Sequence, residues 1–166
     1  MGNDQALSFE VFYLSTRDRC FRAVLATVRE GGEADDLVAE AYTRALAKWS
    51  SVADHPAPSA WVVRTALNLH RDRWRKATRL RLEAVNPAPF TAEIDPVILD
   101  SIAQLSPRQR DVVVFRVLLG LSAIDTAREL GIDAGTVGTH LRRALATLRT
   151  ALVVSPTVST ALEAHR

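Results

Sequence analysis

The chain has 166 residues, of which 48% are apolar, and a net charge of only +2. This length and composition allow a buried core, in one domain or in two small ones, and exclude global disorder. The single cysteine, Cys20, excludes an internal disulfide framework, and we expect it to be a small core residue. No segment has the length and apolar composition of a membrane span, and the first residues lack a signal peptide. We therefore expect a soluble, cytoplasmic protein.

Charge is distributed unevenly along the chain. Residues 64–81 carry seven basic side chains and one acid, whereas residues 1–63 carry six basic and nine acidic ones. Residues 82–95 add three acids and no basic residue. This asymmetry indicates separate surfaces for separate partners, one of them polyanionic.

Helical periodicity dominates the first half. A helix is expected at about 8–29 and a second over 33–49, with Gly31-Gly32 between them. Apolar residues of the second helix recur at i, i+3, i+4 and i+7, which places them on one face. The segment 50–58 has the turn residues of a loop, and a long helix is expected from 59 to about 81.

A linker is expected over residues 83–96, which contain three prolines and show no helical period. Short helices are expected beyond it, at about 97–104 and 107–119. The pattern contains no strand and no internal repeat. The predicted fold class is all-α, with an N-terminal helical bundle linked to a C-terminal helix-turn-helix domain.

The helix-turn-helix is predicted from two capped helices that follow each other closely. Ser122 and Asp133 are the expected N-caps, and Gly131 suits the turn between the helices. The expected buried set is Ile124, Ala127, Leu130, Ile132, Val137 and Leu141. The outward side of the second helix has Thr136, Gly138, Thr139, Arg142 and Arg143, with His140 at its margin. Thr and Arg can reach bases and phosphates in a major groove; two helices of an ordinary bundle are the alternative.

The basic segment forms a stripe on its helix, at Arg64, Asn68, Arg71, Arg75 and Arg79. Like charges at i, i+4 cost a helix about 0.2–0.5 kcal/mol per pair, so a polyanionic partner is the economical explanation. One turn rises about 5.4 Å, roughly one nucleotide step of an extended strand. The stripe therefore indicates nucleic acid. Trp74 falls on another face with apolar residues, and we expect it in the core rather than stacked on a base.

With both elements in view, the chain resembles the extracytoplasmic-function group of bacterial sigma factors, from about residue 8 to 150. "ADDLVAEAYTRAL" is similar to the helix by which the family docks on polymerase, although Ala39 replaces the usual Gln. The basic helix matches the family's Asn-x-x-x-Asp-x-x-Arg-basic signature at Asn68, Asp72, Arg75 and Lys76. The resemblance implies sigma region 2 over 1–82, a linker over 83–96, sigma region 4 over 97–150 and a tail over 151–166.

The resemblance also implies roles. Docking on the clamp helices of the largest subunit of core RNA polymerase would use Asp35, Asp36, Leu37, Glu40 and Arg44. Melting and holding the minus-ten element would use Ser51, His55, Trp61, Arg64, Asn68, Arg71, Arg75 and Lys76. Reading the minus-thirty-five element as duplex would use Arg108, Thr136, Thr139, His140, Arg142 and Arg143. The flap of the second-largest subunit and an anti-sigma factor are further implied partners.

Two other classes of protein compete with this interpretation. A regulator of the quorum-sensing (LuxR) type would share the C-terminal half. Thr-His-Leu at 139–141 of this chain is closer to that group than to typical sigma factors. Such a regulator needs a receiver or ligand-binding domain before it, whereas the first half here is helical. An enzyme is not expected, because the chain has no phosphate-binding glycine loop, no histidines at ligand spacing and hence no expected metal or cofactor.

The recognition helix departs from the family pattern, because Gly138 and His140 stand where Lys and Arg are usual. A glycine within a helix costs about 0.5–1 kcal/mol relative to Ala, and two cations are absent. We predict weaker minus-thirty-five binding than is typical of the family. The affinity of the 96–166 fragment for its own duplex site measures this, and low-nanomolar binding at physiological salt would contradict it.

Overall fold

Within the residues that the computed structural model describes, 3–80 and 95–154, every regular element is a helix. The all-α prediction is confirmed. The order is α1 (Asn3–Val28), α2 (Gly31–Ala47), α3 (Trp49–Ala53), α4 (Pro58–Leu80), α5 (Pro96–Ala103), α6 (Pro107–Val113), the π-helix η1 (Val114–Leu118), α7 (Ala123–Leu130) and α8 (Ala134–Val154). Most of the predicted linker and tail lie outside the described residues. None of the described helices is long and apolar enough to cross a membrane.

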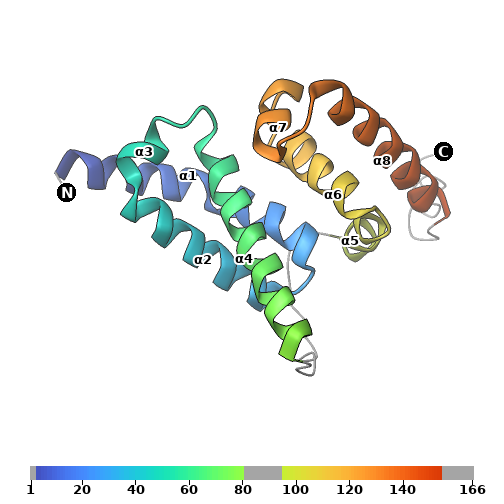
Figure 1. Cartoon of the computed structure of the whole chain (residues 1–166), viewed down its shortest axis with the longest axis horizontal. Coiled ribbons are helices and arrows are strands. Elements are labelled where there is room, and N and C mark those ends of the chain that lie inside the picture. The colour runs from blue at the N-terminus through green and yellow to red at the C-terminus, as the bar shows by residue number, and fades with distance from the viewer. Residues whose placement is uncertain (1–2, 81–94, 155–166) are drawn as a thin grey trace, which may run out of the picture.

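The first half is a bundle of α1, α2 and α4, with the short α3 across one end (Figure 1). The apolar face predicted for the second helix is buried from Ala34 to Ala45. Trp49, predicted as the last residue of that helix, belongs instead to α3. Its ring remains buried and packs on Phe9 and Phe12, with centroid distances of 5.2 and 5.0 Å. Cys20 is completely buried in this bundle, as predicted.

The junction between α1 and α2 differs from the expected glycine break. The left-handed residue is Arg29, with φ of 66°, and Gly31 is the first residue of α2. The carboxylate of Glu30 caps α2, accepting from the Gly32 N–H at 2.9 Å and from the Glu33 N–H. A Cβ at Gly32 would lie 3.2 Å from this carboxylate, so glycine there gives room to the cap.

The second half contains the predicted helix-turn-helix, α7 and α8. Ser122 Oγ accepts from the Asp125 N–H at 3.0 Å, and Asp133 Oδ1 accepts from the Thr136 N–H at 2.8 Å. Gly131 ends α7 with φ of 64°, as its predicted turn position requires. Ala127 and Val137 are buried, with Leu130, Ile132 and Leu141 packed around them. The prediction was wrong for Ile124, which is 67% exposed.

The helix predicted at 107–119 changes type at its middle. After α6 the chain continues as η1, where the Leu119 N–H donates to the Val114 carbonyl at 3.0 Å, five residues back. A π turn accommodates an extra residue and shifts the faces of a helix. Val114 and Phe115 of η1 are buried, whereas Val117 remains 55% exposed.

The two halves share one apolar core. η1 and α5 both pack against α1. Ile102, Phe115, Leu119 and Leu121 of the second half belong to the same buried cluster as the core of the first bundle. Phe115 is among the largest completely buried side chains of the described residues. The halves are therefore held together by apolar packing as well as by their connection along the chain.

We predict that Phe115→Ala lowers the free energy of unfolding by about 3–5 kcal/mol, because truncation of a buried Phe leaves a cavity. Val117→Ala, on the same turn but exposed, should cost less than about 0.5 kcal/mol. Chemical denaturation followed by circular dichroism measures both values. A Phe115→Ala variant as stable as Val117→Ala would show that η1 does not hold the halves together.

Candidate nucleic-acid interface

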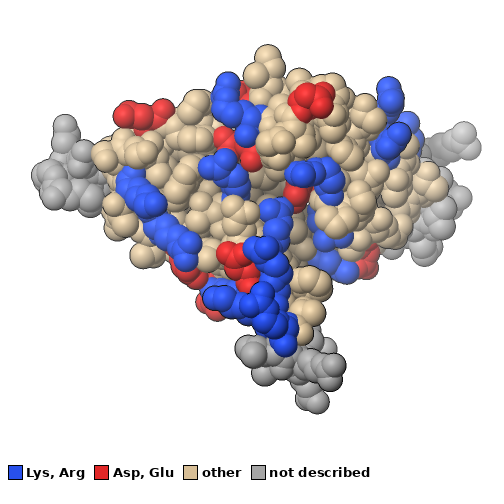
Figure 2. Space-filling model, in the orientation of Figure 1, with Lys and Arg blue, Asp and Glu red and all other residues tan. Residues whose placement is uncertain are grey.

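The basic helix α4 is packed along its first part and projects from the body along its last. Ala60, Val62, Val63, Ala66 and Leu67 are buried. From Arg71 to Arg79 every residue is exposed except the half-buried Ala77. Lys and Arg side chains gather along this projecting end (Figure 2). The exposed end thus presents a dense row of cations with only Asp72 among them, paired with Arg75.

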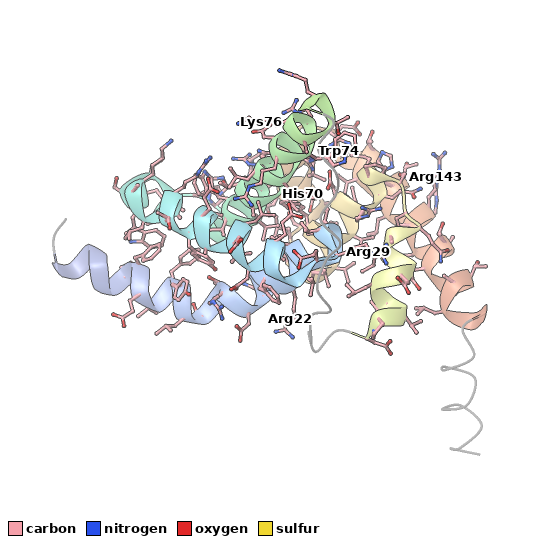
Figure 3. All side chains as sticks on the ribbon, turned by 90° about the horizontal axis from the view of Figure 1, so that it is seen from below. Arg22, Arg29, His70, Trp74, Lys76 and Arg143 are labelled. Carbon is pink, nitrogen blue, oxygen red and sulfur yellow. The ribbon has the colours of Figure 1, made fainter. Side chains whose placement is uncertain are left out.

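Trp74 was expected in the core, and that prediction was wrong. Its side chain is 64% exposed on the projecting end of α4 (Figure 3). Trp74 lies on the same face of α4 as Leu67 and His70. At Trp74, however, α4 projects beyond the bundle. His70, one turn earlier on this face, is half-buried, and its Nδ1 lies 2.9 Å from Glu33 Oε1. The helical face of Trp74 was predicted correctly, but the sequence did not show that α4 projects beyond the bundle at this residue.

A surface pocket of about 480 Å³ lies between the end of α2 and the middle of α4. The sequence assigned Trp61 and Asn68 to the minus-ten site, and both line this pocket. Sequence reasoning missed Lys48 and Thr65, which also line it. The i+4 spacing of Thr65 from Trp61 could have indicated it. Indole, amide and ammonium groups in one pocket can stack on a base, hydrogen-bond its edge and attract a phosphate.

Two arginines of the basic stripe, Arg64 and Arg71, contact helices of the second half. Arg71 donates to Asp111 Oδ2 of α6 at 2.9 Å, and also to Asn68 Oδ1 at 3.0 Å. Arg64 lies 3.3 Å from Glu129 Oε2 of α7. A second surface pocket, of about 450 Å³, remains between the halves beside these pairs. Two of the predicted strand-binding arginines are thus occupied by carboxylates of the other half.

Burial raises the pKa of Asp111, and the guanidinium of Arg71 only partly opposes this. The carboxyl group is therefore easier to protonate in the folded chain than in the unfolded chain. Its contribution to stability is present below the unfolded pKa and is lost as pH rises through the folded pKa. Ionisation of the buried Asp111 is therefore less favourable in the folded chain than in the unfolded chain, although Arg71 lies beside it.

The predicted polymerase-docking residues share the outer side of α2, with one exception. Asp35 pairs with Arg17 at 3.1 Å, and Asp36 is exposed. Glu40 is shared: one carboxylate oxygen lies 2.6 Å from Arg44 and the other 2.9 Å from Arg73 of α4. Leu37 is completely buried, which corrects its assignment as a contact. It supports the helix from inside.

Ser51 and His55 precede α4, in α3 and in the loop after it. Ser51 is exposed. His55 accepts from the Ala57 N–H at Nδ1, at 3.1 Å, and its Nε2 lies 3.2 Å from Glu129. His55 therefore faces the other half, as Arg64 does. Lys76 is exposed on the projecting end of α4.

The predicted recognition residues lie on α8 and beside it. Arg142 and Arg143 are exposed, and Thr139 is partly exposed. Thr136 is engaged by Asp133, as both its N–H and its hydroxyl donate to that carboxylate. His140 is partly buried. Arg108 lies on α6 and donates to the Leu130 carbonyl at 3.3 Å, which fixes it beside the turn of the motif.

The described residues contain no group of His, Cys, Asp and Glu that could hold a metal ion. Burial raises the pKa of the Cys20 thiol, so this side chain is poorly suited to metal binding or nucleophilic chemistry. The chemistry that the arrangement offers is cationic and aromatic. Together with the helix-turn-helix, this chemistry is typical of DNA-binding transcription proteins.

Comparison with known proteins specifies the family. The model of sigma-70 region 2 matches residues 12–80, and that of sigma-70 region 4 matches residues 97–148. The RNA polymerase sigma-E factor of Streptomyces coelicolor is 31% identical over 96% of this chain and 94% of its own length. The ECF RNA polymerase sigma factor SigM of Mycobacterium tuberculosis is 32% identical over 85% of this chain and 75% of its own. The chain belongs to the extracytoplasmic-function group of sigma-70 factors.

A solved structure supports the fold. The sigma factor RpoE of Bartonella quintana, determined in complex with the anti-sigma factor NepR, matches with a TM-score of 0.74. The match covers 89% of this chain and 98% of that one, at 22% sequence identity. The two-part helical architecture is therefore one that an experimentally determined sigma factor also adopts.

We predict that Asp111→Asn increases the free energy of unfolding at pH 7, because it removes a buried charge whose pKa is raised. The gain should shrink as pH falls and vanish below the unfolded pKa of about 3.9, where the wild-type carboxyl is protonated in both states. Denaturant titrations of both proteins between pH 3.5 and 7.5 measure the difference. A variant that is less stable at pH 7 would mean that the pair with Arg71 outweighs the cost of burial.

Proposed function

We propose that this sigma factor binds core RNA polymerase, melts the minus-ten element of a promoter and reads the minus-thirty-five element as duplex. The observation that carries the proposal is the basic stripe of α4 beside the pocket of Trp61 and Asn68. A nucleic-acid strand whose bases are splayed out needs cations for its backbone and a stacking, hydrogen-bonding pocket for a base. α4 and the end of α2 supply both.

In this proposal the non-template strand lies along α4 after the duplex opens. Arg64, Arg71, Arg75 and Lys76 contact its phosphates, and Asn68 contacts a base edge at the pocket. Ser51 and His55 precede the helix and border the melted segment. Each phosphate contact on a single strand adds about 0.7 to the slope of log affinity against log salt concentration. The stripe should therefore give binding that salt weakens steeply.

The second half holds the upstream contact. Arg142 and Arg143 are exposed on α8, and Thr139 lies on the same helix. Arg108 stands beside the turn, where it can reach the DNA backbone. Among the proposed positions, Arg108, Arg142 and Arg143 carry a permanent charge, which is consistent with modest affinity for the duplex alone.

Docking on polymerase is proposed for the outer side of α2, where Asp35, Asp36 and Glu40 form an acidic surface beside Arg44. Acidic side chains at this density suit the basic surface of a helical coiled coil. The flap of the second-largest subunit is proposed as the partner of the second half. We also propose an anti-sigma factor as an inhibitory partner; the matched Bartonella protein was solved with one.

The test is transcription by purified core polymerase from a genomic promoter library, with and without this protein. The expected result is a set of discrete new transcripts that depend on the protein. Transcripts should fall at least about tenfold in an Asn68→Ala, Arg75→Ala variant, since a base contact and a phosphate contact are each worth about 1–3 kcal/mol.

The matched control is Arg22→Ala, which removes an exposed arginine from α1, on the opposite side of the molecule from the end of α4 (Figure 3). It should leave the transcripts unchanged. An equal loss of transcripts in the two variants would contradict a role of the stripe in promoter binding. If no transcripts appear and the protein binds duplex as a dimer without polymerase, the proposal is wrong and a regulator of the quorum-sensing type replaces it.

A further inference from the structure

A solvent-exposed tryptophan stands among the cations at the projecting end of α4. Trp74 is 64% exposed there, between His70 and Lys76 (Figure 3). We propose that Trp74 stacks on an unpaired base of the promoter strand and so holds the melted segment next to the pocket of Trp61 and Asn68. The inference rests on the proposed function, because it assigns a further base contact to the same strand.

The indole of Trp74 contributes little to the packing of the protein. The ring contacts among the described residues all lie within α1, α2 and α3 or between them, and Trp74 takes part in none of them. His70, one turn earlier, is half-buried beside Glu33, whereas the ring of Trp74 lies largely in water. An indole is a large apolar group, so a partner that covers it gains free energy from its burial.

The side chains around Trp74 indicate that this partner is a polyanion. Four exposed side chains share one face of α4, at i, i+3, i+4 and i+7: Arg71, Trp74, Arg75 and Thr78. The ring therefore stands beside guanidinium groups on its own face of the helix. Guanidinium groups bind a phosphate backbone, and a ring between them offers a π surface to the base attached to it.

This end of α4 is less well suited to a protein partner or to a membrane surface. From Arg71 to Arg79, Trp74 is the only large apolar side chain. The centre of a protein interface and the buried face of an interfacial helix both need several apolar side chains. A base needs only one ring to stack on, and its own phosphate favours the neighbouring cations. The composition of the segment therefore favours a base.

The spacing along α4 determines which base Trp74 can reach. Trp74 follows Asn68 by six residues, which is about 9 Å along the helix axis, or fewer than two turns. At roughly one nucleotide step per turn, Trp74 reaches a base one or two nucleotides from the base in the pocket. Six residues also make about one and two-thirds turns, so Asn68 and Trp74 point to different sides of α4. Two neighbouring bases can turn to different sides only in a strand that is unpaired and unstacked.

The experiment uses core polymerase reconstituted with wild type, Trp74→Phe, Trp74→Leu or Leu14→Ala full chains. Leu favours a helix at least as well as Trp, so Trp74→Leu retains α4 and an apolar side chain but removes the π surface. Trp74→Phe keeps a smaller π surface. Leu14→Ala is the matched control, because Leu14 is an apolar side chain of α1 that is 71% exposed. Circular dichroism verifies that each chain is folded.

The readout is the affinity for a promoter obtained from the transcription library, with its non-template strand left unpaired across the minus-ten element. Each unpaired nucleotide is replaced in turn by an abasic one. We expect wild type to lose about fivefold or more in affinity at the stacked position, since a base stacked on an aromatic side chain contributes about 1–3 kcal/mol. Trp74→Leu should bind the intact strand as weakly as wild type binds that abasic strand, and should lose nothing further there.

The same scan with Asn68→Ala identifies the base in the pocket, and the position coupled to Trp74 should lie one or two nucleotides from it. Trp74→Phe should retain part of the loss at the stacked position, which a purely structural role of Trp74 would not produce. Leu14→Ala should match wild type on every strand.

Equal losses by wild type and Trp74→Leu at every abasic position would overturn the stack. A Trp74→Leu chain that binds core polymerase more weakly, with unchanged coupling to every base, would assign Trp74 to a protein contact instead. If wild type supports transcription and Trp74→Leu behaves as wild type on every strand, only the stack is wrong. If wild type gives no polymerase-dependent transcripts, the proposed function is wrong and the stack is wrong with it.

Discussion

The packing of η1 on α1 is the contact on which the arrangement of the molecule depends. It buries Phe115 between two halves that are separated in sequence by a proline-bearing segment. Val114 and Phe115 of the π turn are both buried in the cluster that contains the core of the first bundle. A regular helix over the same residues would rotate these side chains relative to α1. Every electrostatic contact between the halves is set by this apolar docking.

Docking of the halves forms ion pairs between residues that are far apart in the sequence, which the amino-acid composition does not show. The net charge is near zero because acids elsewhere offset the basic helix, and several of those acids lie against it. Asp111 and Glu129 come from different helices of the second half and reach Arg71 and Arg64, respectively. The second half therefore engages two arginines of α4 with its own carboxylates, while the projecting end of the helix stays exposed. Burial of one of these carboxylates, Asp111, is costly, and it raises the pKa of that group.

The sequence predicted most local structure because local signals determine it. Caps at Ser122 and Asp133, the turn at Gly131 and the buried face of α2 all depend on neighbours within a few residues. The failures depended on tertiary context. Trp74 is apolar and in register with the core, yet it is exposed, and so is Ile124. Periodicity gives the direction of a face and does not say how far the body extends.

The residue types of the candidate site could be predicted from the sequence, but the side chains that contact them could not. The stripe was visible at i, i+4 and i+7, but its engagement by α6 and α7 follows from the docking of the halves. The pocket of Trp61 and Asn68 needed Lys48 from the end of α2, which no short-range pattern connects to α4. The left-handed conformation of Arg29 was not predicted, because the glycines that follow it adopt positive φ at a lower energetic cost.

Glu40 joins two surfaces that have been described separately. Its one negative charge is divided between Arg44, on the acidic side of α2, and Arg73, on the projecting basic helix. A basic group that approaches α2 and draws Glu40 away leaves Arg73 without its counter-charge, and an anion that draws Arg73 away frees Glu40. Occupancy of either surface then favours occupancy of the other by the same factor, as thermodynamic linkage requires. The coupling passes through a single carboxylate and needs no movement of the backbone.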